Sequence, residues 1–266
     1  NTEAVADATP QITFTELGLP DAVVAALAKN SITVPSPIQA KALPDALAGR
    51  NVLGRAQTGS GKTLAFGLPM LARLAGGRAR SRKPRGLVLV PTRELAMQVS
   101  DSLEPLVHVS GLRIKLVAGG LSYTGQTAAL DKGVDVLIAT PGRLVDLLDR
   151  GALTLDEVEV AVLDEADHMA DMGFLPDIQR IINLLSPRRQ NLMFSATFSD
   201  DIKALAIESI RAGSRCGSPA TSMPSSIASS ASGTPTCTTT RGSTGWNSTG
   251  PRPTGCDCTK PLPPTP

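Results

Sequence analysis

The sequence is poor in cysteine and in aromatic residues. All four cysteines (Cys216, Cys237, Cys256 and Cys258) lie in the last quarter of the chain, and residues 1–210 contain none. The spacing Cys256-x-Cys258 is too short for a zinc knuckle, and no histidine follows it. We therefore expect neither a disulfide framework nor a structural zinc site. Aromatic residues make up 3% of the chain, so a packed core must consist mainly of Leu, Val, Ile and Ala.

Long apolar runs are also missing. No stretch approaches the roughly 20 residues that a membrane-spanning helix requires. The first residues lack the charged, apolar and small-residue succession of a signal peptide. We therefore expect no membrane association and a cytoplasmic location.

The charge of the chain excludes a generally basic, nucleic-acid-binding body. The formal net charge is +2, but five Lys/Arg and only one Asp lie from Arg211 onward. Residues 1–210 therefore hold 21 basic and 23 acidic residues, a net charge of −2. Any prediction of nucleic-acid binding must come from motifs instead.

Short apolar runs alternate with helical patterns over residues 21–210. The expected strands are 52–55, 86–90, 113–117, 134–139, 158–163 and 191–194. The expected helices are 21–29, one that starts at Ser36-Pro37, 62–74, 93–107, 123–130, 141–150, 175–185 and 200–210. The strands are almost continuously apolar, as in strands buried on both faces. This alternation predicts an α/β fold with a parallel sheet and helices on both faces.

The composition divides the chain into three parts. Residues 1–13 are a weakly patterned lead-in, residues 14–210 form the predicted domain, and residues 211–266 are mostly Ser, Thr, Pro and Gly. Such a tail cannot bury enough apolar surface to offset its ordering entropy, so we expect disorder. The tail is either a natural disordered segment or the product of out-of-frame translation. We favour out-of-frame translation because the composition changes in the middle of an expected secondary-structure element.

The strongest motif is Ala56-Gln57-Thr58-Gly59-Ser60-Gly61-Lys62-Thr63, between an expected strand and an expected helix. This context is that of a phosphate-binding loop, in which glycines let backbone N–H groups surround an anion at a helix N-terminus. Lys62 would reach the β- and γ-phosphates, and the Thr63 hydroxyl would bind Mg²⁺. The strict pattern has Gly in the place of Ala56. A Gly/Ser turn that happens to precede Lys-Thr is the ordinary alternative.

A second motif, which is acidic, follows an expected buried strand. Asp164-Glu165-Ala166-Asp167 comes directly after the apolar run 158–163. Asp164 can hold Mg²⁺, and Glu165 can orient and deprotonate an attacking water. An acidic run is more often an ordinary helix start, but its combination with the phosphate loop favours a catalytic site.

Other polar residues also follow expected strands. Thr92, Thr140 and Ser195 come after strands, as Lys62 and Asp164 do. Because ligands bind outside the carboxyl ends of parallel strands, we expect these residues at one sheet edge. Free N–H groups at the helix starts there suit the phosphates of a nucleic-acid backbone, although ordinary helix capping explains each one singly.

These motifs, taken together, resemble those of the DEAD-box RNA helicases over residues 14–210. Asp164-Glu165-Ala166-Asp167 carries the family's name, and Ala56–Thr63 is similar to its motif I. The resemblance implies RNA contacts at Pro91, Thr92, Arg93, Gly119, Gly120, Thr140, Pro141, Gly142 and Arg143. It implies a coupling role for Ser195 and Thr197, adenine recognition by Gln39, and packing of Phe14 against the base.

The resemblance further implies a RecA-like, P-loop NTPase fold, ATP and Mg²⁺ as ligands, and RNA as partner with little sequence preference. The stretch 189–206 and Met172-Gly173-Phe174 are similar to bacterial members of the RhlE type. Ser31-Ile32 stands where the family usually has Gly-Phe, and nothing after Ile210 resembles the family's second RecA-like domain. We therefore expect an ATP-dependent RNA helicase whose unwinding fails without that second domain. The alternatives are a non-catalytic, nucleotide-gated RNA-binding fragment and a P-loop ATPase that acts on DNA or protein.

Overall fold

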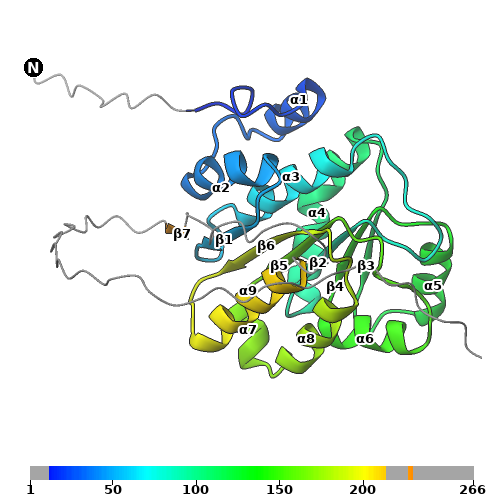
Figure 1. The fold of residues 1–266 in the computed structure, drawn as a ribbon. Helices are drawn as coiled ribbons and strands as arrows, with labels where there is room; N and C mark the ends of the chain where they lie inside the picture. Colours follow the sequence, from blue (N-terminus) through cyan, green and yellow to red (C-terminus); the bar gives the residue numbers. More distant parts are fainter. Residues whose placement is uncertain (1–11, 214–226, 230–266) are drawn as a thin grey trace, which may run out of the picture. The chain divides into compact units, whose positions relative to one another are not determined.

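A computed structural model describes residues 12–213 and 227–229 of the chain (Figure 1). Its centre is a sheet with the strand order β3-β4-β2-β5-β6-β1-β7, in which every pair of neighbours is parallel. The strands are β1 (Val52–Arg55), β2 (Gly86–Leu89), β3 (Ile114–Val117), β4 (Val136–Ala139), β5 (Val160–Asp164), β6 (Gln190–Ser195) and β7 (Ile227–Ser229). The predicted parallel sheet is confirmed.

The helices follow the expected order. They are α1 (Asp21–Lys29), α2 (Pro37–Leu47), α3 (Lys62–Leu74), α4 (Arg93–Val109), α5 (Tyr123–Asp131), α6 (Pro141–Asp149), α7 (Ala166–Asp171), α8 (Leu175–Leu184) and α9 (Asp200–Gly213). The helix α7 was not expected as a separate element. It has six residues, too few for a helical period of apolar positions to show in the sequence.

Two apolar cores lie on opposite faces of the sheet, because successive strand residues point to opposite sides. In β2, Val88 belongs to a core with buried side chains of α1, α2, α3 and α4. Leu87 and Leu89 belong to a core with buried side chains of α5, α6, α7, α8 and α9. Figure 1 shows α1 to α4 on one side of the sheet and α7 to α9 on the other. The predicted cover of helices on both faces is confirmed.

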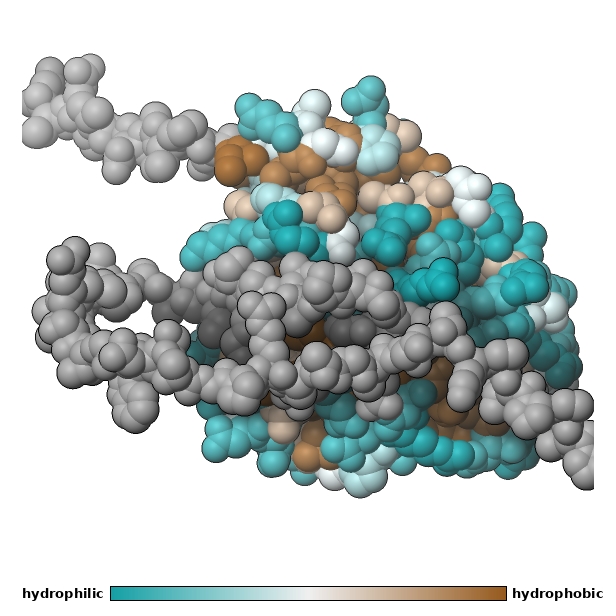
Figure 2. All heavy atoms as spheres, in the orientation of Figure 1, coloured by the Kyte–Doolittle hydropathy of each residue, from teal (hydrophilic) through white to brown (hydrophobic). Residues whose placement is uncertain are grey.

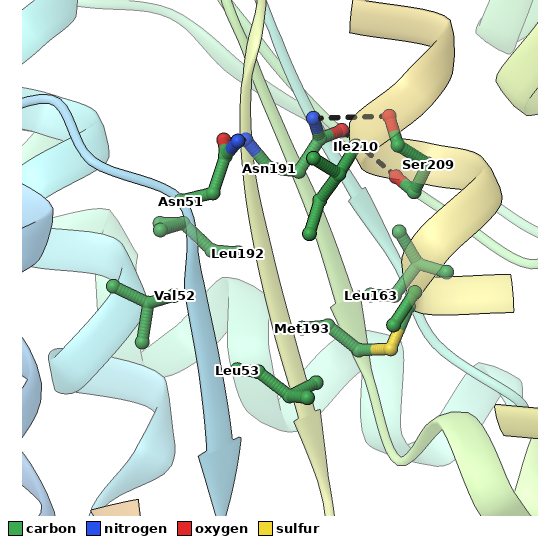
Figure 3. A pocket seen from close by; sticks show the side chains of 10 residues that line it. Asn51, Val52, Leu53, Leu163, Asn191, Leu192, Met193, Ser209 and Ile210 are labelled. Carbon is green, nitrogen blue, oxygen red and sulfur yellow. Dashed lines mark hydrogen bonds between the residues drawn. The ribbon is translucent and has the colours of Figure 1, made fainter. Parts of the chain in front are cut away.

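A buried polar cluster attaches the end of α9 to the start of β6. The Ser209 hydroxyl donates to Asn191 Oδ1 at 2.9 Å, and Asn191 Nδ2 donates to the Ser209 carbonyl at 3.3 Å (Figure 3). The Arg189 guanidinium donates to Asn191 Oδ1 at 2.8 Å and to the carbonyls of Leu185, Ser186 and Ser209. Carbonyls at the ends of two helices thus surround this buried cation.

The tail differs in part from its prediction. Residues 211–213 continue helix α9, and Ile227–Ser229 form β7 and pair with Leu53, Gly54 and Arg55 of β1. Strand pairing uses backbone groups, so a segment of unfavourable composition can still add to a free sheet edge. The rest of the predicted disordered tail, 214–226 and 230–266, lies outside the described residues.

The visible surface is mainly polar. Figure 2 shows hydrophilic residues over much of the coloured surface, with apolar residues gathered towards the top, in the region of α1. None of the described helices is long and apolar enough to cross a membrane.

Candidate nucleotide and RNA site

The C-terminal ends of the parallel strands bring the predicted site residues to one edge of the sheet. In spatial order, this edge holds Gly119 and Gly120 after β3, residues 140–143 after β4, residues 91–93 after β2, Asp164 and Glu165 at β5, residues 195–197 at β6, and residues 56–63 after β1. The predicted RNA contacts therefore follow β3, β4 and β2. The predicted phosphate and metal contacts follow β5 and β1, the two strands that flank β6.

The loop after β1 has the backbone of a phosphate cradle. Gly59 and Gly61 have φ angles of 82° and 92°, a region that favours glycine. A Cβ atom at Gly61 would lie 2.6 Å from Gln39 Nε2 and 2.8 Å from Ser36 Oγ, so no larger residue fits. The Ala56 N–H donates to the Ser195 carbonyl at 3.1 Å and anchors the loop to β6. The loop ends at α3, whose first residue is Lys62.

Lys62 bridges the phosphate loop and the acidic end of β5. Its Nζ donates to Glu165 Oε1 at 2.7 Å and lies 3.7 Å from Asp164 Oδ1. The Thr58 hydroxyl donates to the same Glu165 oxygen at 2.6 Å. All three charged side chains are at most 9% exposed. The two predicted catalytic carboxylates therefore surround the lysine that is predicted to bind phosphate.

The two carboxylates have different surroundings. Burial raises the pKa of Asp164 to about 6, although the nearby Lys62 ammonium favours the ionised form. Glu165 has a φ of 54°, an uncommon backbone conformation for a residue with a side chain. Such strained positions persist where neighbouring contacts hold them and are frequent at functional sites. Here the contacts are those from Lys62 and Thr58.

The site offers ligands that suit Mg²⁺. The Asp164 carboxylate and the Thr63 hydroxyl are hard oxygen donors, and both residues line the cleft described below. No group of three or more His, Cys, Asp or Glu within the described chain could form an all-protein metal cage. Mg²⁺ commonly keeps several waters and binds through one or two carboxylates plus phosphates, so these residues fit a metal that arrives with a nucleotide.

The predicted adenine contacts, Phe14 and Gln39, are both buried. Phe14 is only 2% exposed and lies in the core beneath α1 to α4. It presents almost no surface to a ligand, because its large apolar ring is more stable inside that core. Gln39 is buried and links α2 to the phosphate loop: its Nε2 donates to the Gly61 carbonyl at 2.9 Å, and its Oε1 accepts from the Ser36 N–H at 3.0 Å.

The predicted RNA contacts form a row of helix starts and one turn. Thr92 caps α4 and accepts from the Leu95 N–H at 3.3 Å, and Thr140 precedes α6, which begins with Pro141. A Cβ atom at Gly120 would lie 3.2 Å from Arg93 Nη1, so the turn after β3 and the start of α4 are neighbours. Gly119 and Gly142 are exposed, whereas Pro91 and Pro141 are buried, and Arg143 is partly exposed.

The predicted coupling residues meet the last residue of the acidic motif. Asp167 Oδ2 accepts from the Thr197 N–H at 2.8 Å and from the Thr197 hydroxyl at 2.9 Å. The Asp167 N–H donates to Ser195 Oγ at 3.1 Å. Burial acts to raise the pKa of Asp167, but its contacts with Ser195 and Thr197 outweigh burial and lower it. Asp167 was not among the predicted site residues. The sequence signal that could have identified it is its place as the last residue of the acidic motif 164–167.

A cleft of about 440 Å³ opens beside the phosphate loop. Its lining residues are Leu27, Asn30, Ile32, Thr58, Gly59, Gly61, Lys62, Thr63, Leu64, Leu95, Gln98, Val99, Asp101, Ser102, Pro105, Leu106, Asp164 and Glu165. The part contributed by α4, with Gln98 and Asp101, was not predicted. The apolar spacing along 93–107 indicated a helix, but not which stripe of that helix would face a ligand.

A second cavity lies between β1, β6 and α9 (Figure 3). Leu53, Leu163 and Met193 contribute apolar side chains to it. Its volume is about 20 Å³, room for about one water molecule. The nucleotide site therefore belongs to the larger cleft.

The fold and the site define a class. A glycine-rich loop between a parallel strand and a helix, with a lysine that meets an acidic strand end, is the arrangement of a P-loop nucleotide-binding domain. Residues 36–205 match the model of the DEAD/DEAH box helicase family. The chain belongs to this family.

Individual relatives agree with this assignment. The chain is 47% identical over 201 residues to the DEAD-box ATP-dependent RNA helicase 3A of Zea mays, covering 74% of this chain and 27% of the relative. It is 44% identical over 201 residues to the ATP-dependent RNA helicase RhlB of Shigella dysenteriae, covering 73% of this chain and 48% of the relative. Across the curated relatives compared, the chain spans between 25% and 48% of their length.

A solved structure supports the fold. The crystal structure of a hypothetical ATP-dependent RNA helicase from Sulfolobus tokodaii matches with a TM-score of 0.67 and 33% identity, over 72% of this chain and 55% of that one. The predicted RecA-like fold is confirmed.

Proposed function

We propose that this chain is the ATP-binding half of an ATP-dependent RNA helicase. It binds ATP with Mg²⁺ on the β5 and β1 side of the sheet edge and RNA on the β3, β4 and β2 side. The observation that carries this proposal is the buried contact of Lys62 with Glu165 and Asp164 beneath a glycine-rich loop.

The contacts of Lys62 support a change of partner on nucleotide binding. The Lys62 ammonium interacts with the two carboxylates in the structure. A triphosphate offers the ammonium stronger, multiply charged acceptors. Lys62 then turns to the β- and γ-phosphates, and Glu165 becomes free to orient a water molecule and accept its proton.

The metal contacts complete the arrangement. Thr63 and Asp164 would hold Mg²⁺, which supplies charge neutralisation between the β- and γ-phosphates when bound. Asp164 has to be ionised to hold a cation, so its raised pKa of about 6 means that Mg²⁺ competes with a proton for this carboxylate. Glu165 stays close to the site through its backbone N–H, which donates to Asp164 Oδ1 at 3.1 Å.

The proposed RNA contacts use groups that nucleic-acid backbones favour. Helix starts at Thr92 and Thr140 present N–H groups, and Arg93 and Arg143 add positive charge. Such contacts address phosphates and 2′-hydroxyls, so we expect little sequence preference.

Hydrolysis by this chain alone is proposed to be negligible. Among the described residues that line the cleft, only Lys62 carries a positive charge. An additional arginine contributes about 10³–10⁵ in rate to related phosphoryl transfers. We propose that a second RecA-like domain supplies this charge and the other wall of the RNA groove.

The test measures phosphate release by residues 1–266 with and without single-stranded RNA. We expect almost no turnover, partial recovery when the second domain of a related helicase is added, and loss of that recovery in Glu165→Gln. Turnover on the order of 1 s⁻¹ by the chain alone, as for a typical enzyme, would overturn the need for a second domain. Equal recovery with DNA in place of RNA would favour the DNA-directed alternative.

A nucleotide-gated RNA-binding fragment is the second candidate, because the chain spans at most about half of the compared relatives. It differs from the first in one outcome. A fragment would bind RNA more tightly with ATP than without, yet show no recovery of hydrolysis with the second domain.

The bacterial RhlE type remains our proposal for the subgroup. It rests on the stretch 189–206 and on Met172-Gly173-Phe174. Relatives named RhlB and DeaD are each 44% identical to the chain. Comparison of residues 172–206 with the same segment of each type would decide the subgroup.

A further inference from the structure

Helix α4 forms the second wall of the nucleotide cleft. Its lining residues are spaced so that they return to one side at each helical turn, and they are Leu95, Gln98, Val99, Asp101, Ser102, Pro105 and Leu106. This period places them on one stripe of the helix. Thr58, Gly59 and Gly61–Leu64 line the same cleft, so the stripe and the phosphate loop open onto one space.

Two polar side chains of this stripe have no protein partner. Gln98 and Asp101 are exposed, and within the described chain neither the Gln98 amide nor the Asp101 carboxylate makes a hydrogen bond or ion pair. The neighbouring Ser102 differs, because its hydroxyl donates to the Gln98 carbonyl at 2.8 Å. The oxygens of Gln98 and Asp101 are thus available to a ligand.

The charge of the cleft restricts what these oxygens can meet. Asp101, Asp164 and Glu165 line it together with a single cation, Lys62. A carboxylate beside a bare triphosphate repels it, and a hydrated cation between them removes the repulsion. Mg²⁺ keeps several of its waters when bound, and these waters are donors that carboxylate and amide oxygens accept.

We propose that Gln98 and Asp101 are positioning residues that contact the water shell of nucleotide-bound Mg²⁺ from the α4 side. This inference rests on the proposed function and extends the metal site beyond Thr63 and Asp164. It makes the Asp101 carboxylate unfavourable to metal-free nucleotide and favourable to the Mg²⁺ complex.

The test is the Mg²⁺ dependence of nucleotide binding. The affinity of residues 1–266 for a fluorescent ATP analogue is titrated with excess Mg²⁺ and again with EDTA. Gln98→Ala and Asp101→Asn are each expected to weaken binding with Mg²⁺ by about threefold to tenfold, the effect of one hydrogen bond. With EDTA, Gln98→Ala should bind as the wild type does, and Asp101→Asn should bind equally or more tightly.

Two substitutions serve as matched controls. Gln179→Ala on α8 and Asp201→Asn on α9 change exposed residues of the same types that do not line the cleft. Both should leave the affinity unchanged under both conditions, and circular dichroism checks the fold of all four variants.

The outcomes separate the two proposals. If the wild type binds no nucleotide with Mg²⁺, the proposed function falls and this inference falls with it. If the wild type binds and the Mg²⁺ effect is unchanged in both cleft variants, only this inference is wrong. Equal weakening with Mg²⁺ and with EDTA would also overturn it, because the contact would then be with the nucleotide and not with its metal shell.

Discussion

Lys62 and Glu165 are 103 positions apart in the chain, and their side chains form a buried contact of 2.7 Å between Nζ and Oε1. The contact joins the start of α3 to the end of β5. It brings a predicted phosphate ligand and a predicted general base into direct contact. Binding of a triphosphate has to replace this contact, so the strength of nucleotide binding reports directly on Lys62.

Lys62→Ala is expected to weaken binding of the ATP analogue with Mg²⁺ by about tenfold to hundredfold, the usual effect of losing a hydrogen bond to a charged group. The measurement is a fluorescence titration. Lys29→Ala is the control, since Lys29 is an exposed lysine of α1 outside the cleft. Unchanged affinity in Lys62→Ala would contradict the phosphate-loop assignment.

Asp164→Asn is expected to stabilise the fold at neutral pH but not at acid pH. The pKa of Asp164 rises from 3.8 to about 6 on folding because of burial. The unfolded chain therefore ionises first, and stability falls as the pH rises from about 4 to about 6, then stays level. A difference of two pKa units between the folded and unfolded states corresponds to about 3 kcal/mol of stability lost at neutral pH. The variant does not lose this stability, because asparagine does not ionise.

Urea unfolding of both proteins at about pH 4 and pH 7.5 measures this effect. The gain of the variant should be largest at the higher pH and close to zero at the lower one. Asp201→Asn, on the exposed start of α9, should show no such difference. A variant that is equally stabilised at both pH values would contradict the raised pKa.

Arg189→Lys is expected to lower the free energy of unfolding by about 2 kcal/mol or more, because a lysine cannot reproduce the several hydrogen bonds of the guanidinium fork. Arg189 is 6% exposed and donates to Asn191 and to carbonyls at the ends of α8 and α9. The adjacent Arg188 is exposed, so Arg188→Lys should change stability by less than about 0.5 kcal/mol. Equal effects of the two substitutions would show that the buried contacts contribute nothing.

Two truncations test the role of β7. Removal of residues 232–266 is expected to leave the thermal midpoint unchanged, since their Ser, Thr, Pro and Gly content supports no core. Removal of 214–266 also deletes β7 and its three paired positions on β1, and should lower the midpoint by about 2–4 °C. Identical midpoints would mean that β7 adds no stability and that the whole tail is dispensable.

The elements of the fold follow from local patterns in the sequence. The apolar runs at 86–90 and 134–139 indicate strands buried on both faces, and such strands occur in parallel sheets. The bounds of α1, α3 and β1 coincide with those expected, because capping residues, glycines and a regular apolar period mark them. The expected strand ends at 139 and 163 likewise predict that Thr140 and Asp164 lie at one edge of the sheet.

The candidate site depends on information of two kinds. Residues 56–63 and 164–167 are contiguous motifs whose chemistry resides in their own backbone and side chains, so their sequence predicts them. The polar stripe of α4 could not be predicted, because its role depends on which face of the helix the packing of α3 leaves towards the cleft. The contact of Phe14 with a base stays a prediction for the same reason: whether a phenylalanine meets a ligand or a core depends on its neighbours in space.

The sequence by itself determined the alternating α/β order, the phosphate loop, the acidic strand end and the family. The tertiary structure decided the order of the strands along the edge, with the RNA candidates beside β3, β4 and β2 and the phosphate contacts beside β5 and β1. The tertiary structure also decided that Lys62 forms an ion pair with Glu165 and that Gln39 donates a hydrogen bond to Gly61. It further decided that Ile227–Ser229 pairs with β1. The physical reason is that local patterns report the periodicity and conformation of neighbouring residues, whereas these contacts join segments whose proximity only chain packing creates.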